Sequence, residues 1–188
     1  MWTSTLKKGL FLLIIVLSIF TFNQNIIFAD STDDIISFEI KGYTFTYENA
    51  PLKIREEYKK SCEEISSTPL PDDEIFISEE NITNYTVRSS IGTYTSYKIR
   101  YSENKFIVSG AKNYTVYNYE KVGYNYTKKG NPVHLVQLLL NRVGYNLNVD
   151  SSFGSKTYNA VKSFQSKNLL TVDGIVGNKT WICFSNKL

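Results

Sequence analysis

The chain has 188 residues, two cysteines and a formal net charge of +3, a length that suits one or two small domains. Without its first 29 residues it would keep 19 basic and 18 acidic residues, a charge of +1. This near-neutral balance excludes nucleic-acid binding driven by the release of counterions, so no nucleic-acid partner is expected.

An export signal is the first predicted element. Lys7 and Lys8 precede an apolar run at residues 9–22, and a polar break then leads into Ile27, Phe28 and Ala29. This order is typical of a cleaved secretory signal, and the run is shorter than the roughly 20 residues that cross a bilayer. We therefore expect residues 1–29 to be a signal peptide and the mature protein to be secreted, either extracellular or associated with the cell wall. No stable membrane association is expected after cleavage.

Residues 30–127 are predicted to form an α+β domain with an antiparallel sheet and one main helix. Apolar residues alternate at 36–40 and at 43–47 on either side of Lys41 and Gly42, which predicts a β-hairpin. Helical spacing then predicts one helix at 52–65. Short strand-like runs follow at 74–78, 84–89, 94–101, 105–108 and 114–119. The sequence assigns this domain neither a family nor a ligand.

Tyrosine is dense at the end of this domain. Tyrosine favours strands and stabilises cross-strand pairs, which is the interpretation that we favour. The alternative is an aromatic platform that stacks on sugar rings. The residues concerned are Tyr94, Tyr97, Tyr101, Tyr114, Tyr117, Tyr119, Tyr124 and Tyr126.

The two cysteines, Cys62 and Cys183, leave two alternatives open. Export to an oxidising compartment would permit a disulfide between them. In the predicted helix at 52–65, however, Cys62 falls on the same apolar face as Ile54 and Tyr58, where a free thiol packs as a small hydrophobic group.

Residues 128–188 are predicted to form a small all-α domain of three helices, entered through a short linker. Asn131 is the expected N-cap of the first helix, Pro132 suits its first turn, and Gly144 suits a left-handed residue at its end.

Two segments of this domain, 149–158 and 172–181, align without gaps. Their common frame is Val-Asp-x-x-apolar-Gly-x-Lys-Thr-aromatic. The Asp carboxylate can bond backbone amides across its own turn, and the glycine permits a tight entry into a helix. Each frame is therefore predicted to make a turn and to open a helix, at about 155–167 and 178–184.

The order and spacing of these residues resemble the type 1 peptidoglycan-binding domain over about residues 130–184. The resemblance implies a three-helix module that docks on peptidoglycan without catalysis, metal or cofactor of its own. Ser151 and Leu169 stand where the family usually has glycine, and a positive φ there would strain a residue with a side chain. The structural motif consists of Asp150, Phe153, Gly154, Thr157, Phe164, Gly174, Gly177, Thr180 and Trp181.

Contacts with peptidoglycan are expected at polar or half-exposed positions near the two turns, because most of the motif is core. The predicted ligand-binding residues are Tyr145, Tyr158, Gln165 and Asp173.

The residue inventory argues against most wall enzymes. His134 is the only histidine, so residues 31–126 cannot supply a zinc site with two or three histidines or a Cys–His pair. A glycosidase needs only two carboxylates, but no acidic pair is singled out by an apolar setting. We therefore expect a wall-docking binding protein with no catalytic residue, metal or cofactor. The alternative is a small peptidoglycan hydrolase with its active site in residues 31–126.

Overall fold

The computed structural model describes residues 37–85 and 92–188. The predicted signal peptide at 1–29 lies outside the described residues, and so does most of the predicted strand at 84–89. The described residues form one compact unit. No helix in the described ranges is long and apolar enough to cross a membrane.

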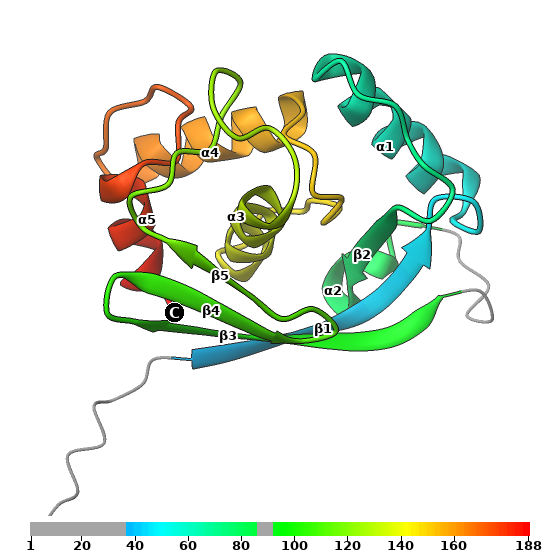
Figure 1. The fold of residues 1–188 in the computed structure, drawn as a ribbon, viewed down its shortest axis with the longest axis horizontal. Helices are drawn as coiled ribbons and strands as arrows, with labels where there is room; N and C mark the ends of the chain where they lie inside the picture. Colours follow the sequence, from blue (N-terminus) through cyan, green and yellow to red (C-terminus); the bar gives the residue numbers. More distant parts are fainter. Residues whose placement is uncertain (1–36, 86–91) are drawn as a thin grey trace, which may run out of the picture. The chain divides into compact units, whose positions relative to one another are not determined.

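An antiparallel sheet of five strands, in the order β2-β1-β3-β4-β5, lies beneath the helices in Figure 1. Its strands are β1 Ser37–Thr46, β2 Glu74–Ser78, β3 Thr93–Ser102, β4 Lys105–Gly110 and β5 Tyr114–Tyr117. The helices are α1 Leu52–Glu64, α2 Glu79–Ile82, α3 Asn131–Arg142, α4 Ser155–Lys167 and α5 Asn178–Ser185. The predicted α+β region followed by three helices is therefore confirmed.

The hairpin predicted at Lys41 and Gly42 is wrong, because β1 runs through both residues as one strand. A Cβ atom on Gly42 would lie 2.1 Å from the backbone oxygen of Ile77 on β2, so glycine here permits close strand pairing rather than a turn. Successive residues of a strand point to opposite faces. Phe38 and Phe45 therefore belong to different cores. In the sequence, this change of the buried face along one strand resembles two strands joined by a turn.

The smaller core lies between α1 and the paired strands β1 and β2. On α1 it contains Ile54, Tyr58 and Cys62, which share one face of the helix as expected. Phe45 and Ile75 meet them from the sheet.

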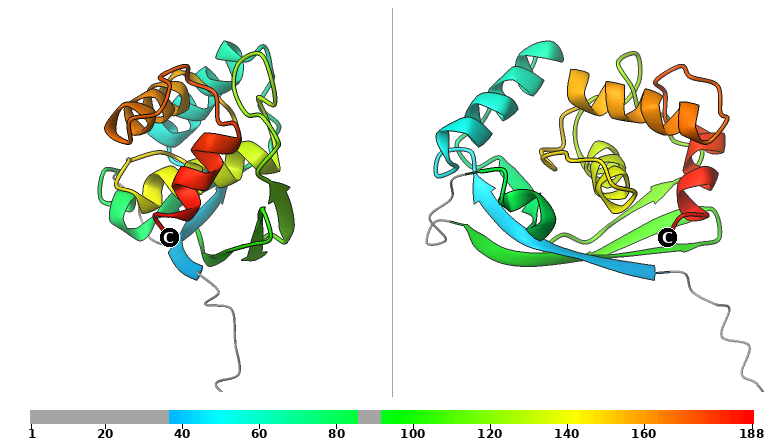
Figure 2. Two further views of the ribbon diagram at one scale, coloured as in Figure 1. Left: turned by 90° about the vertical axis from the view of Figure 1, so that its left-hand side faces the viewer. Right: turned by 180° about the vertical axis from the view of Figure 1, so that it is seen from behind.

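The larger core is covered by α3, α4 and α5. Figure 2 shows α3 between the sheet and α4, and every residue from Val133 to Asn141 on α3 is buried, as expected for a helix enclosed on all sides. Gly130, with a φ of 99°, occupies the N-cap position that we predicted for Asn131, and Asn131 is already helical. Among the described residues, no side-chain hydrogen bond caps the N-terminus of α3.

The larger core also crosses the expected boundary between residues 127 and 128. The rings of Phe106 on β4 and Trp181 on α5 are 5.5 Å apart, and those of Tyr97 and His134 are 4.9 Å apart. The predicted linker is also engaged, since Lys128 accepts a backbone hydrogen bond from Phe153. The domain boundary at residue 127 therefore stays a prediction, because residues on both sides of it belong to one hydrophobic core.

Two residues confirm the backbone strain expected in the C-terminal region, and a glycine adopts the expected positive φ. Ser151 and Leu169 have φ values of 60° and 56°, in the left-handed region that costs a residue with a side chain about 1–2 kcal/mol. Gly144 ends α3 with a φ of 92°, as predicted.

Candidate functional site

The first of the two repeated frames forms a turn at residues 149–157, here called the first turn. Gln137 on α3 reaches into it, and its Nε2 donates to Asp150 Oδ1 at 2.7 Å and to Thr157 Oγ1 at 3.1 Å. Its Oε1 accepts from the Ser151 amide at 2.9 Å. Asp150 Oδ1 in turn accepts from the Ser152 amide at 2.9 Å. A single buried amide therefore fixes both ends of the turn.

The second turn, residues 172–180, repeats this arrangement with Gln165 of α4. Gln165 Nε2 donates to Asp173 Oδ1 at 2.8 Å and to Thr180 Oγ1 at 3.4 Å, and its Oε1 accepts from the Gly174 amide at 2.9 Å. Asp173 Oδ1 accepts from the Ile175 amide at 2.8 Å. The sequence repeat is thus a repeat of hydrogen bonds.

Gln137 is the functional partner that sequence reasoning did not single out. The two glutamines precede the aspartates of their frames by different distances, since Gln137 lies 13 residues before Asp150 and Gln165 lies 8 before Asp173. The only available signal was a glutamine on the helix that leads into each frame. Spacing alone therefore could not pair them.

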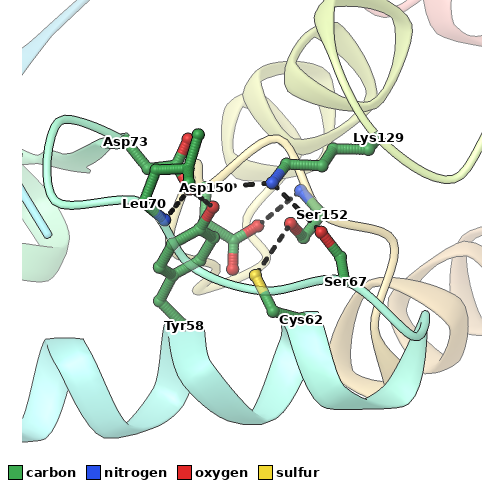
Figure 3. A network of polar contacts seen from close by, with 8 residues as sticks. All are labelled: Tyr58, Cys62, Ser67, Leu70, Asp73, Lys129, Asp150 and Ser152. Atoms are coloured by element: carbon green, nitrogen blue, oxygen red, sulfur yellow. Dashed lines mark hydrogen bonds and ion pairs between the residues drawn. The ribbon is translucent and has the colours of Figure 1, made fainter.

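The N-terminal region covers the first turn. Cys62 Sγ on α1 is 3.8 Å from Ser152 Oγ (Figure 3). The Glu64 carboxylate accepts hydrogen bonds from the backbone amide and the hydroxyl of Ser155, the first residue of α4. Gly154 packs so close to α1 that an added Cβ would lie 3.1 Å from the Ser61 Cα atom. Helix α1 therefore covers the part of this turn that holds Ser152 and Gly154, both of which are buried.

A second set of contacts holds the loop after α1 against the start of the C-terminal region. Asp73 Oδ2 accepts from the Tyr58 hydroxyl at 2.6 Å and lies 3.6 Å from Lys129 Nζ (Figure 3). Burial raises the pKa of Asp73, but hydrogen bonds from the Leu70 amide and Tyr58, with the Lys129 charge, outweigh it and lower the pKa overall. Asp73 is therefore held as a structural anion.

Asp150 at the first turn is only 5% exposed. Burial raises its pKa to about 6, despite the hydrogen bonds from Gln137 and Ser152 that favour its charged form. The hydrogen bonds of this carboxyl hold the turn, and it does not line the groove described below.

The second turn, in contrast, borders an open groove of about 350 Å³. Asp173 is exposed at its edge. Asn178 and Lys179, the first residues of α5, line it at the positions that Ser155 and Lys156 hold in the first frame. Within the described residues, no side chain accepts from the Asn178 amide and Lys179 forms no ion pair. Lys121 and Tyr126 line the groove as well.

Of the predicted contact residues, Gln165 and Asp173 line this groove, whereas Tyr145 and Tyr158 do not. Tyr145 is half-buried and donates to Ser163 Oγ at 3.2 Å. The Tyr158 ring packs on Gly174, where an added Cβ would come within 2.0 Å of a ring carbon. Gln165 itself is 1% exposed, so its amide serves the turn.

The aromatic residues of the motif are core. Phe153, Phe164 and Trp181 are buried, and Trp181 Nε1 donates to the Glu120 backbone oxygen at 2.8 Å. This bond fastens the segment after β5 to α5.

Both cysteines are free, so the structure does not contain the disulfide between Cys62 and Cys183. His134 is buried, with Nδ1 2.6 Å from the Tyr114 hydroxyl. Burial, with the nearby Lys112 charge, lowers its pKa to about 3, which keeps the ring neutral. The described residues contain no cluster of three or more metal-ligating side chains.

Comparison with known proteins places both halves of the chain. Two different family models, each described as "Putative peptidoglycan-binding domain", match residues 36–99 and 129–183. The chain is also similar to the crystal structure of a peptidoglycan-binding protein from Clostridioides difficile in complex with glutamine hydroxamate. The identity is 41% over 78% of this chain and 92% of that one, with a TM-score of 0.72.

Proposed function

The chain belongs to a family of peptidoglycan-binding proteins, and from this premise we propose that it docks non-covalently onto peptidoglycan through the groove at the second turn. Family membership implies association with the cell wall. The observation that carries the proposal is the unequal use of two matched turns. The first is closed by α1, whereas the second presents the same backbone and side-chain groups to solvent.

The closed turn indicates what the open one would bind. At the first turn, the Glu64 carboxylate bonds Ser155 at the start of α4, and the Glu57 carboxylate lies 2.9 Å from Lys156 Nζ. The equivalent residues at the start of α5 are Asn178 and Lys179, which have no such partner among the described residues. Carboxylates are favoured at helix N-termini and beside lysine.

The peptide stems of peptidoglycan supply such carboxylates. The similar Clostridioides difficile protein was crystallised with glutamine hydroxamate, an amino-acid derivative, which supports the peptide part of the polymer as a ligand of this family. Lys121, which also lines the groove, would add a second cation to the site.

The N-terminal region matches a peptidoglycan-binding family of its own, which sequence reasoning did not recognise. We expect this region to support the same attachment, since its α1 braces the first turn and the two regions share one core. Export by the segment at 1–29 would deliver the protein to the wall.

Binding rather than catalysis is supported by the way the acids of the described residues are used. Glu57 accepts from Tyr85 and Asn148, and Glu64 accepts from Ser155. Asp73 and Asp150 are held in the contacts given above. These four carboxylates build the fold. Glu39, Glu79 and Glu80 line a groove elsewhere, where Glu79 accepts a hydrogen bond from Tyr94 and Glu39 pairs with Lys41.

A charge reversal at Lys179 tests the proposal. We expect Lys179→Glu to reduce co-sedimentation with purified insoluble peptidoglycan at least tenfold, about 1.4 kcal/mol. Lys187→Glu makes the same change on an exposed residue outside the groove and should sediment like the unaltered protein. Equal sedimentation of the two variants, or none by the unaltered protein, contradicts the proposal. Release of soluble muropeptides would establish the hydrolase alternative.

A further inference from the structure

Two tyrosines, Tyr117 at the end of β5 and Tyr119 just after it, form a stacked pair on the surface. The rings of Tyr117 and Tyr119 are 5.2 Å apart and 17° from parallel. Their exposures are 41% and 70%. Most other tyrosines of this region have structural partners, such as Tyr97 in the core and Tyr114 against His134. The exposed pair has no such role among the described residues.

The turn that carries the pair is rigid. The Tyr117 amide donates to Glu120 Oε1 at 2.8 Å, and the Glu120 amide donates to the Tyr117 oxygen at 3.0 Å. Between the tyrosines, Asn118 is buried, and its amide donates to the backbone oxygen of Asn104 at 2.9 Å. The backbone that carries the two rings is therefore held in place, which lowers the entropic cost of binding a ligand.

This turn continues into the groove at the second turn. Glu120 accepts the Trp181 indole bond from α5, whose first residues line the groove. Lys121, two residues after Tyr119 and at most about 7 Å farther along the chain, lines the groove itself. Its Nζ lies 5.1 Å from the centre of the Tyr126 ring, which is 43% exposed. Figure 1 shows the chain leaving β5 and running alongside α5.

We infer that the pair Tyr117–Tyr119 binds the glycan strand of peptidoglycan, while the groove beyond Lys121 takes its peptide stem. This inference rests on the function proposed above. The apolar face of a pyranose ring can lie flat on an exposed tyrosine ring, and the phenolic hydroxyl and nearby Lys121 can bond sugar hydroxyls. A polymer that carries sugars and peptides on adjacent units would contact both surfaces at once.

The pair suits a saccharide for a further reason. Ionisable groups of both signs lie next to the pair. Glu120 and Lys121 directly follow Tyr119 in the chain, and Lys105 is the partner of Tyr117 on the neighbouring strand β4. A neutral, hydroxyl-rich ligand matches such a mixed rim better than a strongly charged one.

Titration of the full chain with chitotetraose, a soluble chain of four N-acetylglucosamine units, tests the inference. We expect Tyr119→Ala to weaken binding about five- to tenfold, the range of one aromatic stacking contact. Tyr119→Phe keeps the ring and should bind within twofold of the unaltered protein. Tyr94→Ala removes another exposed tyrosine, from β3, and serves as the control, with no loss expected.

The outcomes separate this inference from the proposed function. If chitotetraose does not bind, or binds Tyr119→Ala as well as the unaltered protein, the glycan contact is wrong. Wall docking through the groove still stands in that case if Lys179→Glu reduces sedimentation with peptidoglycan and Lys187→Glu does not. If sedimentation with peptidoglycan is absent but chitotetraose binding depends on the Tyr119 ring, the saccharide site stands and docking through the groove fails.

Discussion

The first and second turns of the C-terminal region have the same sequence frame and the same glutamine clamp, but one is closed and the other is open. Asp150 is buried beneath α1, whereas Asp173 faces solvent beside a groove. Ser155 receives a carboxylate from α1, and its counterpart Asn178 receives none from the described residues. A repeated local structure can thus serve as a joint in one copy and as a ligand site in the other.

Removing the clamps should show the largest difference between the turns. Gln137→Ala would leave the buried Asp150 carboxylate and the Ser151 amide without their partner, at an expected cost of about 3–5 kcal/mol. Gln165→Ala leaves an exposed Asp173 that water can solvate, so we expect about 1–2 kcal/mol. Urea unfolding of both variants measures the free energies, and a cost at Gln165 equal to that at Gln137 would contradict the difference in burial.

Proton binding should distinguish the closed turn through Asp150. Its pKa is about 6 in the folded protein and 3.8 when unfolded, so the folded state binds more protons between these values. Asp150 therefore costs stability as the pH rises from about 4 to 6, by about 3 kcal/mol in all.

Asp150→Asn removes this cost, so its stability relative to the unaltered protein should rise by about 3 kcal/mol between pH 4 and pH 7. His134 acts in the opposite direction but is the same in both proteins, so it cancels in the difference. The free energy of unfolding of both proteins can be measured across this pH range. A difference between them that did not change with pH would contradict the raised pKa of Asp150.

The smallest expected effect concerns the residues that lead into the two turns. Gly144 ends α3 and Leu169 follows α4, both with positive φ. Leu169 is 96% exposed, so Leu169→Gly should relieve strain and stabilise the protein by about 0.5–1 kcal/mol. Gly144→Ala should cost about 1 kcal/mol, since an added Cβ meets nothing within 4 Å and only the backbone is strained. Thermal unfolding that moved in the same direction for both would contradict this reasoning.

Local patterns predicted most of the elements. The bounds of β2 and α4 were predicted to the residue, and α1 ends one residue earlier than expected. The failures were at Gly42, where a change of buried face along β1 resembled a turn, and at Asn131, where Gly130 takes the cap position. Both depend on what packs around the backbone rather than on the residues themselves.

The candidate site was predicted only in part. Asp173 and Gln165 do meet at the groove, because the repeated frame placed them near one turn. Tyr145 and Tyr158 do not line the groove, although Tyr158 packs on Gly174 of the second turn. A pattern of half-exposed positions could not predict this difference. Lys121 and Tyr126 come from the segment after β5, which the sequence did not connect with the helices.

The sequence by itself determined the two equivalent frames and the helices that they open, because these follow from periodicity, glycine positions and short-range hydrogen bonding. The family of the C-terminal region followed from the resemblance of its motif to that of known proteins. Only the tertiary structure decided which frame is open to a ligand. Glu64 and Ser155 are 91 positions apart in the chain, and whether α1 covers one turn or the other depends on how the sheet and helices pack into a shared core, which no local pattern encodes.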